Sequence, residues 1–163
     1  MEQPFVAVSD MTGDGHAQSL GPERIGGEHE NTVRWIHLDG KYETSAGWLE
    51  RNAELDPLVI ESLTAEDARP RSYVKGKGLL LVLRGVNLNP GADPDDMVSV
   101  RAWIEPDRII TLHDRKVMAV EDIRDAFAEG CGPCDSGGFL VELALRLSER
   151  MSDPISEIED AAD

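Results

Sequence analysis

The sequence predicts an α/β fold, and three observations support this class. Residues 79–83 (LLLVL) form a continuous apolar run of strand length, which is typical of a buried strand. Residues 32–38 and 97–104 alternate with a period of two, as the side chains of a strand do. In residues 117–127 and 139–151, apolar side chains instead recur at helical spacing. The chain therefore combines a sheet with several helices.

The alternating segments predict which side chains share a face of the sheet. One face of residues 32–38 carries Val33, Trp35 and His37, and the other carries Arg34, Ile36 and Leu38. Residues 97–104 place Val98, Val100, Ala102 and Ile104 on one face and Ser99, Arg101 and Trp103 on the other. Short connections join residues 79–83, 97–104 and 109–112, which predicts an antiparallel meander.

The segments around the meander are predicted from their composition and capping residues. Residues 5–8 are apolar and open the sheet, whereas residues 10–31 are rich in glycine and polar residues and predict a loop. Ser45 is the expected N-cap of a first helix, and Asp56 is that of a second helix that begins at Pro57. Gly130 is expected to end the helix over residues 117–127.

The C-terminal part of the chain predicts a domain boundary. Asp153 and Pro154 suit the N-cap and first position of a last helix. We therefore expect an α/β domain over residues 1–151 and the beginning of a long helix over residues 152–163. Because acidic residues, and neither glycine nor a basic turn, follow Pro154, the natural protein is expected to continue beyond Asp163.

Composition excludes several classes of function. Thirty-two acidic residues against 16 basic ones give a formal net charge of -16, which repels nucleic-acid phosphates and anionic lipids. Nucleic acid is therefore not an expected partner. The longest apolar run falls far short of the ~20 residues that span a bilayer, and the N-terminus does not resemble a secretory signal. With two cysteines close together, these features predict a soluble chain in a reducing, cytoplasmic setting.

The two cysteines form Cys131-Gly132-Pro133-Cys134, a sequence that also occurs in the redox loop of thioredoxin-like proteins. Here the pair follows a predicted helix and not a strand, and neighbouring acidic residues raise a thiol pKa. Two cysteines also supply only half of the four ligands of a structural zinc site. Three interpretations stay open: a turn between helices, a thiol–disulfide oxidoreductase site, and a weak metal half-site completed across a subunit interface.

Two segments resemble a known family of membrane proteins. Residues 56–63 (DPLVIESL), followed by Arg69-Pro70-Arg71, resemble the helix-then-strand passage in the cytoplasmic domain of CorA-type divalent-cation transporters. Residues 83–89 (LRGVNLN) and 91–101 (GADPDDMVSVR) resemble the ZntB-like, zinc-transporting branch of that superfamily. The similarity runs from about Trp35 to the end of the chain, in the expected order.

This resemblance implies an architecture and a function. The fold would have helices on both faces of a mixed, largely antiparallel sheet, an α/β/α sandwich followed by a long helix toward the membrane. The full-length protein would be a homopentamer at the cytoplasmic face of the inner membrane, with its own membrane helices beyond Asp163. It would pass Zn²⁺, with proton coupling, or Mg²⁺ or Co²⁺ as in CorA-type channels. No enzymatic activity and no cofactor are implied, and the divalent cation is cargo or a regulatory ligand.

The resemblance also indicates candidate metal ligands. Glu61 matches a position beside a regulatory cation site between subunits, where magnesium-type relatives have a following aspartate. Here that position is Ser62, and a hydroxyl is a poorer ligand for a hard cation than a carboxylate. Glu61 is therefore either a ligand or a surface acid. In a ring of subunits, acids of the last helix would attract cations toward the pore: Glu157, Glu159, Asp160 and Asp163.

Overall fold

The computed structural model describes residues 4–41, 43–66, 69–93 and 96–162, with the backbone alone for residues 152–162. Seven strands form one sheet in the order β2-β1-β3-β7-β6-β5-β4. β3 and β7 pair in parallel, and the other neighbouring strands pair antiparallel. The strands are β1 (Phe5–Met11), β2 (Ala17–Ser19), β3 (Val33–Asp39), β4 (Arg71–Lys75), β5 (Gly78–Gly85), β6 (Val98–Ile104) and β7 (Arg108–His113).

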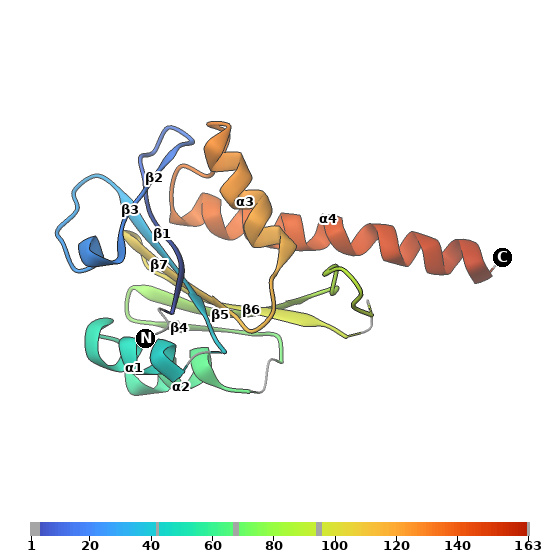
Figure 1. Ribbon diagram of the computed structural model, residues 1–163, viewed down its shortest axis with the longest axis horizontal. Helices are drawn as coiled ribbons and strands as arrows, with labels where there is room; N and C mark the ends of the chain where they lie inside the picture. The colour runs from blue at the N-terminus through green and yellow to red at the C-terminus, as the bar shows by residue number, and fades with distance from the viewer. Residues whose placement is uncertain (1–3, 42, 67–68, 94–95, 163) are drawn as a thin grey trace.

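Helices cover both faces of this sheet, as Figure 1 shows. A short 3₁₀ helix, η1 (Pro22–Arg24), follows β2. The α-helices are α1 (Glu43–Asn52), α2 (Pro57–Thr64), α3 (Met118–Ala128) and α4 (Ser136–Ala162). α1 and α2 lie against one face, and α3 and α4 lie against the other. The expected α/β/α sandwich over a mixed, largely antiparallel sheet is confirmed.

Two hydrophobic cores fill the spaces between these layers, and the alternation of the strands separates them. Trp35, Val100 and Ala102 pack with residues of α3 and α4, such as Ile123 and Phe139. The opposite faces of the same strands pack with α1 and α2 through Ile36, Leu38 and Trp103, which meet Leu49 and Leu63. Burying one such large apolar side chain contributes about 1.5–3 kcal/mol, so the two cores fix the layers.

The antiparallel meander is confirmed as β5, β6 and β7. Val82 pairs with Arg101, which in turn pairs with Leu112 on the far side of β6. The apolar run in β5 is covered on both faces, because Leu80 and Val82 are buried toward α1 and α2 while Leu81 and Leu83 pack partly against the other core.

The segment expected to be a loop, residues 10–31, contains more structure than its composition indicates. It includes the end of β1, all of β2 and η1. β2 has three residues, too few for a side-chain period to appear. Its position is set by pairing with β1, where Ser9 faces Ser19, so the sequence pattern could not reveal it.

Two of the expected capping residues are confirmed, and one is wrong. The Asp56 carboxylate accepts a hydrogen bond of 2.8 Å from the Leu58 N–H at the start of α2, and Gly130 follows α3 with a φ of +76°. Ser45, however, lies inside the first turn of α1, which begins at Glu43. Its hydroxyl donates a 2.6 Å hydrogen bond to the Asp39 carbonyl and so ties α1 to the end of β3.

The expected start of a new helix at Asp153 and Pro154 is also wrong, because α4 is continuous from Ser136 to Ala162. Proline at position 154 removes one backbone donor from the helix, but the neighbouring backbone bonds can hold its course. The division expected between residues 151 and 152 therefore falls within α4. Beyond the sheet, the C-terminal part of this helix projects away from the rest of the molecule (Figure 1).

Candidate functional site

Glu61 is an exposed residue near the end of α2. It contributes to the wall of a shallow hollow of about 650 Å³ between α2 and the edge strand β4. Ser62, Arg71 and Tyr73 also line this hollow. The arrangement places a single carboxylate beside a hydroxyl and a guanidinium, which is a weak set of ligands for a hard cation.

The acidic residues of the C-terminal segment lie on the other side of the molecule. Glu157, Glu159 and Asp160 belong to the projecting part of α4, where the backbone is described, and Asp163 lies outside the described residues. Because α2 and α4 cover opposite faces of the sheet, a single chain does not bring Glu61 together with these acids (Figure 1).

Cys131 and Cys134 lie in the loop between α3 and α4, as expected for a turn between helices. Both are exposed and free. The Gly132 N–H donates a 2.9 Å hydrogen bond to the Gly15 carbonyl, which holds this loop against the β1–β2 turn. Among the described residues, no group of three or more His, Cys, Asp and Glu side chains is placed to hold a metal ion. The metal half-site across an interface stays a prediction.

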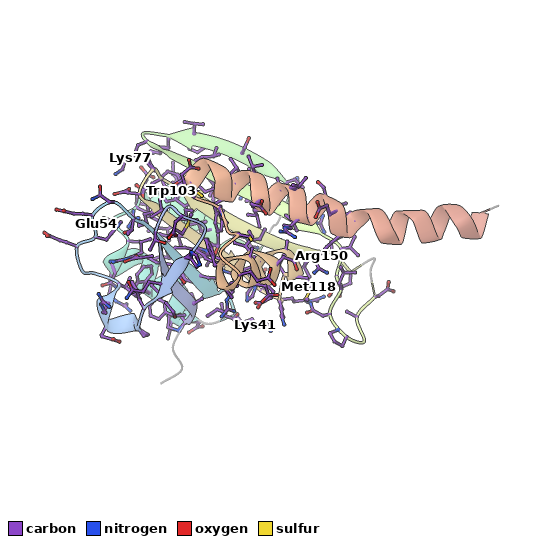
Figure 2. The ribbon with its side chains drawn as sticks, turned by 90° about the horizontal axis from the view of Figure 1, so that it is seen from above. Lys41, Glu54, Lys77, Trp103, Met118 and Arg150 are labelled. Atoms are coloured by element: carbon purple, nitrogen blue, oxygen red, sulfur yellow. The ribbon has the colours of Figure 1, made fainter. Side chains whose placement is uncertain are left out.

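An ion pair joins α4 to α3 at the point where α4 leaves the sheet. Arg150 donates two hydrogen bonds of 2.6 Å, from Nε and Nη2, to the two carboxylate oxygens of Asp122. The hydrogen bond to Arg150 is the main cause that lowers the pKa of Asp122. Figure 2 shows Arg150 where α4 passes beyond the packed layers. This two-point contact restrains the base of the projecting segment.

Two histidines that are far apart in the sequence meet inside the molecule. The parallel pairing of β3 with β7 places His37 opposite Thr111, and His37 Nδ1 lies 2.6 Å from Thr111 Oγ1. Trp35 Nε1 donates a 2.8 Å hydrogen bond to the same hydroxyl. On its other side, His37 Nε2 lies 3.3 Å from His113 Nδ1. The four side chains form one buried hydrogen-bonded row.

Burial disfavours the charged form of both histidines. It lowers the pKa of His37 well below the ordinary value, and the nearby His113 and Arg124 lower this pKa further. Burial likewise lowers the pKa of His113, although the carboxylates of Asp39, Glu121 and Asp114 oppose the shift and Lys41 adds to it. The row therefore stabilises the contact between β3 and β7 in its uncharged state.

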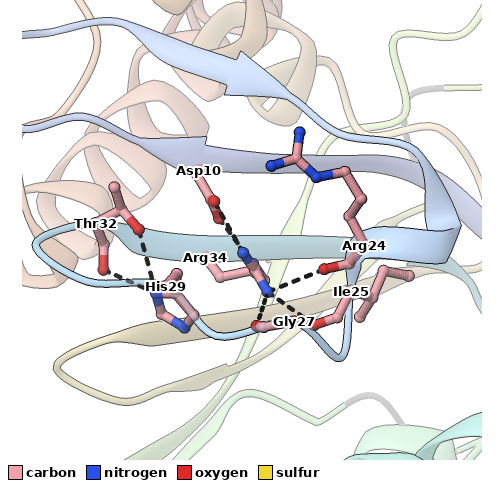
Figure 3. Close-up of polar contacts among 7 residues, drawn as sticks. All are labelled: Asp10, Arg24, Ile25, Gly27, His29, Thr32 and Arg34. Atoms are coloured by element: carbon pink, nitrogen blue, oxygen red, sulfur yellow. Dashed lines mark hydrogen bonds and ion pairs between the residues drawn. The ribbon is translucent and has the colours of Figure 1, made fainter.

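A second buried polar cluster organises the segment between β2 and β3 (Figure 3). Arg34 on β3 donates to both carboxylate oxygens of Asp10, at 2.8 and 2.9 Å. Its Nη1 also contacts the carbonyls of Arg24, Ile25 and Gly27, at 3.2, 2.9 and 2.6 Å. One guanidinium thus holds the backbone of the loop around it, which is a structural role.

The alternation in the sequence contained a signal for these buried charges. It placed Arg34 on the face of Ile36 and Leu38, and Arg101 on the face of Trp103. A charged residue on an apolar face requires a partner when the face is buried. The partner of Arg34, Asp10, came from a segment expected to be a loop, so the pair itself was not predicted.

No helix within the described residues is long and apolar enough to cross a membrane.

Comparison with known families identifies one match that covers most of the chain. The profile of the family described as "CorA-like Mg2+ transporter protein" matches residues 30–163. Among curated proteins, the zinc transport protein ZntB of Yersinia enterocolitica is 31% identical over 150 residues, which are 92% of this chain and 45% of that protein. ZntB of Pectobacterium carotovorum is 39% identical over 126 residues, which are 77% and 38% of the two lengths. The chain thus spans less than half of these relatives.

Solved structures with the same fold include both whole proteins and isolated domains. The full-length CmaX protein matches 99% of this chain with a TM-score of 0.93 and 33% identity, and the match covers 50% of that protein. The ZntB cytoplasmic domain from Vibrio parahaemolyticus matches 98% of this chain and 64% of its own, with a TM-score of 0.84 and 25% identity. The CorA magnesium transporter from Methanocaldococcus jannaschii has a TM-score of 0.72 at 14% identity, which is a likeness of fold.

Proposed function

Because the chain belongs to the CorA family, we propose that it is the cytoplasmic domain of a divalent-cation transporter of the ZntB type. One observation carries this proposal: 98% of the chain superposes on a domain of ZntB that is itself described as cytoplasmic. Members of this family are transporters, which argues against the alternative of a thiol–disulfide oxidoreductase. The role of this domain is to bind and guide cations and to regulate transport, without chemistry of its own.

Zinc is the proposed cargo, since the relatives that are 31% and 39% identical to this chain over the aligned residues are zinc transport proteins. Mg²⁺ is the second candidate, because the family profile carries the name of a magnesium transporter. In this proposal the full-length protein is a homopentamer at the cytoplasmic face of the inner membrane, and zinc transport is coupled to protons. The projecting part of α4 supports the placement, since it gives the domain one extended element that leads away from its core (Figure 1).

Within this proposal the acids of α4 have a collective role. Repeated around a ring of five subunits, Glu157, Glu159, Asp160 and Asp163 would raise the local concentration of divalent cations near the pore. The effect is one of long-range attraction between charges, so it depends on ionic strength. It needs no fixed coordination geometry.

The test uses the full-length protein in proteoliposomes and measures initial uptake rates of Zn²⁺, Mg²⁺, Co²⁺ and Ni²⁺. Neutralising the four acids (E157Q, E159Q, D160N and D163N) is expected to lower the uptake rate and to flatten its dependence on salt. A matched control removes four exposed acids elsewhere: E23Q, E28Q, E30Q and E50Q. If both sets of variants behave like the wild type, the proposed role of the acids is wrong. If no divalent cation enters, the proposed function is wrong.

A further inference from the structure

Arg101 carries a buried charge that the described residues satisfy incompletely. Its side chain is 2% exposed and lies on the face of β6 that is covered by α1 and α2. Nη1 donates to Asp114 Oδ2 at 3.3 Å, a long contact to a carboxylate that is half exposed. Nε and Nη2 are buried and have no hydrogen-bond partner in the part of the chain that the structure describes. Buried guanidinium donors normally have acceptors, because an unsatisfied donor costs free energy.

Arg101 also lines a small cavity at the beginning of α1. The cavity has a volume of about 130 Å³, and Lys41, Ser45 and Asp114 contribute to its wall together with the buried Leu63 and Leu112. This space holds about four water molecules, at roughly 30 Å³ each, and so accommodates a solute of a few heavy atoms. The first N–H groups of a helix have no partner within the helix, and the helix dipole makes that end attractive to negative charge.

The charges around the cavity favour an anion as its occupant. Arg101, Lys41 and the N-terminus of α1 are positive, and Glu43 and Asp114 are negative. Of these, Arg101 alone is fully buried, and its charge acts through a medium that screens it less than water does. A cation in the cavity would add to this buried positive charge, whereas an oxyanion would offset it.

We propose that this cavity is a binding site for a compact oxyanion, either inorganic phosphate or a small carboxylate. The oxyanion would accept hydrogen bonds from the first turn of α1 and from Lys41, beside the Arg101 guanidinium. Binding would tie α1 to the central strands β6 and β7. The inference concerns the domain itself, so it holds whether or not the full-length protein transports zinc.

The experiment measures binding of two probes, sodium phosphate and sodium acetate, to the 163-residue chain by amide chemical shifts. Sodium chloride at equal ionic strength is the reference. Saturable shifts centred on Lys41, Glu43 and Ser45 are expected with at least one probe, and the probe that saturates at the lower concentration identifies the class of oxyanion. Shifts that grow without saturation, or that centre on another surface, would overturn the proposal.

Two variants with the same change in charge distinguish binding at the cavity from general attraction of anions to the positive charges of the protein. R101M removes the buried cation and keeps an apolar side chain of comparable length, and it is expected to weaken binding by about tenfold or more. R84M removes an exposed arginine of the neighbouring hollow beyond Asp114, and binding should stay as in the wild type. If R101M does not fold, K41M at the exposed rim is the substitute, with an expected loss of several-fold. Equal affinity in the wild type and the folded site variant contradicts the proposal.

Discussion

Arg150 of α4 and Asp122 of α3 face each other with two hydrogen bonds of equal length, 2.6 Å, at the point where α4 leaves the sheet. A paired contact of this kind restrains both the position and the rotation of the arginine side chain. It is partly exposed to solvent, with side-chain exposures of 36% for Arg150 and 19% for Asp122, so its effect on stability is moderate.

The variant D122N is expected to lower the free energy of unfolding by about 1 kcal/mol, since it removes the charge but keeps the shape of the side chain. The larger expected effect is local: amide hydrogen exchange in α4 beyond Leu147 should accelerate. D125N, on the same helix, is the matched control. Unchanged exchange in D122N would show that packing alone orients α4.

Stability is expected to fall as the pH drops below about 6.5, because of His37 and His113. In the unfolded chain both imidazoles take up a proton near their ordinary pKa of about 6.5. In the folded protein burial lowers both pKa values, so the unfolded state binds more protons in this window. The contribution of these two histidines to stability is therefore fully present above pH 6.5. It is lost as the pH falls toward their lower pKa values in the folded protein. The slope is up to about 1.4 kcal/mol per pH unit for each histidine.

Urea unfolding between pH 5 and pH 8 measures this slope. The variant H37Q should reduce it, whereas H16Q, which changes a histidine with a 61% exposed side chain, should leave it as in the wild type. A slope that is identical in the wild type and H37Q would show that other groups carry the pH dependence.

The variant D10N is expected to destabilise the protein by about 2–3 kcal/mol, because it leaves the buried guanidinium of Arg34 without its counter-charge. The three backbone carbonyls around Nη1 limit the loss. Thermal unfolding measures the effect, and limited proteolysis should cut the loop at residues 24–31 more rapidly. E28Q, in the same loop and exposed, is the control; a D10N protein as stable as E28Q would contradict the role given to the pair.

Binding of Mg²⁺ near Glu61 can be tested by removing this carboxylate or by adding a second one at position 62. In the full-length protein, E61Q is expected to change the Mg²⁺ dependence of transport little, since a single exposed carboxylate binds this cation weakly. S62D adds a second carboxylate at the next position of α2 and is expected to create inhibition by Mg²⁺ at lower concentration than in the wild type. S72D, on the same hollow, controls for the added charge. A strong effect of E61Q alone would instead identify Glu61 as a ligand.

Local patterns predicted the elements whose side chains enter the cores. Residues 32–38 and 97–104 alternate because β3 and β6 separate two cores, and Asp56 and Gly130 mark helix ends through their own backbone geometry. The edge strands β2 and β4 have mostly exposed side chains, so neither shows an apolar period. β4 was indicated through the family resemblance alone.

Contacts between segments that are far apart in the sequence cannot be predicted from local sequence patterns. His37 and His113 are 76 residues apart in the sequence, and the parallel pairing of β3 with β7 brings them together. Arg101 was placed on the correct face, but its missing partners are visible only when every neighbour has a position. Proline at position 154 predicts a new helix, because proline is favoured at the first position of a helix. This local preference takes no account of the helix that precedes the proline.

The unbroken course of α4 has a mechanical consequence. At 1.5 Å per residue, its 27 residues form a rod of about 40 Å. The first half of α4 packs against the sheet through Phe139, Leu143 and Leu147. The ion pair between Arg150 and Asp122 lies just beyond these residues along the helix. A tilt of α4 by a few degrees would therefore displace its far end by an ångström or more.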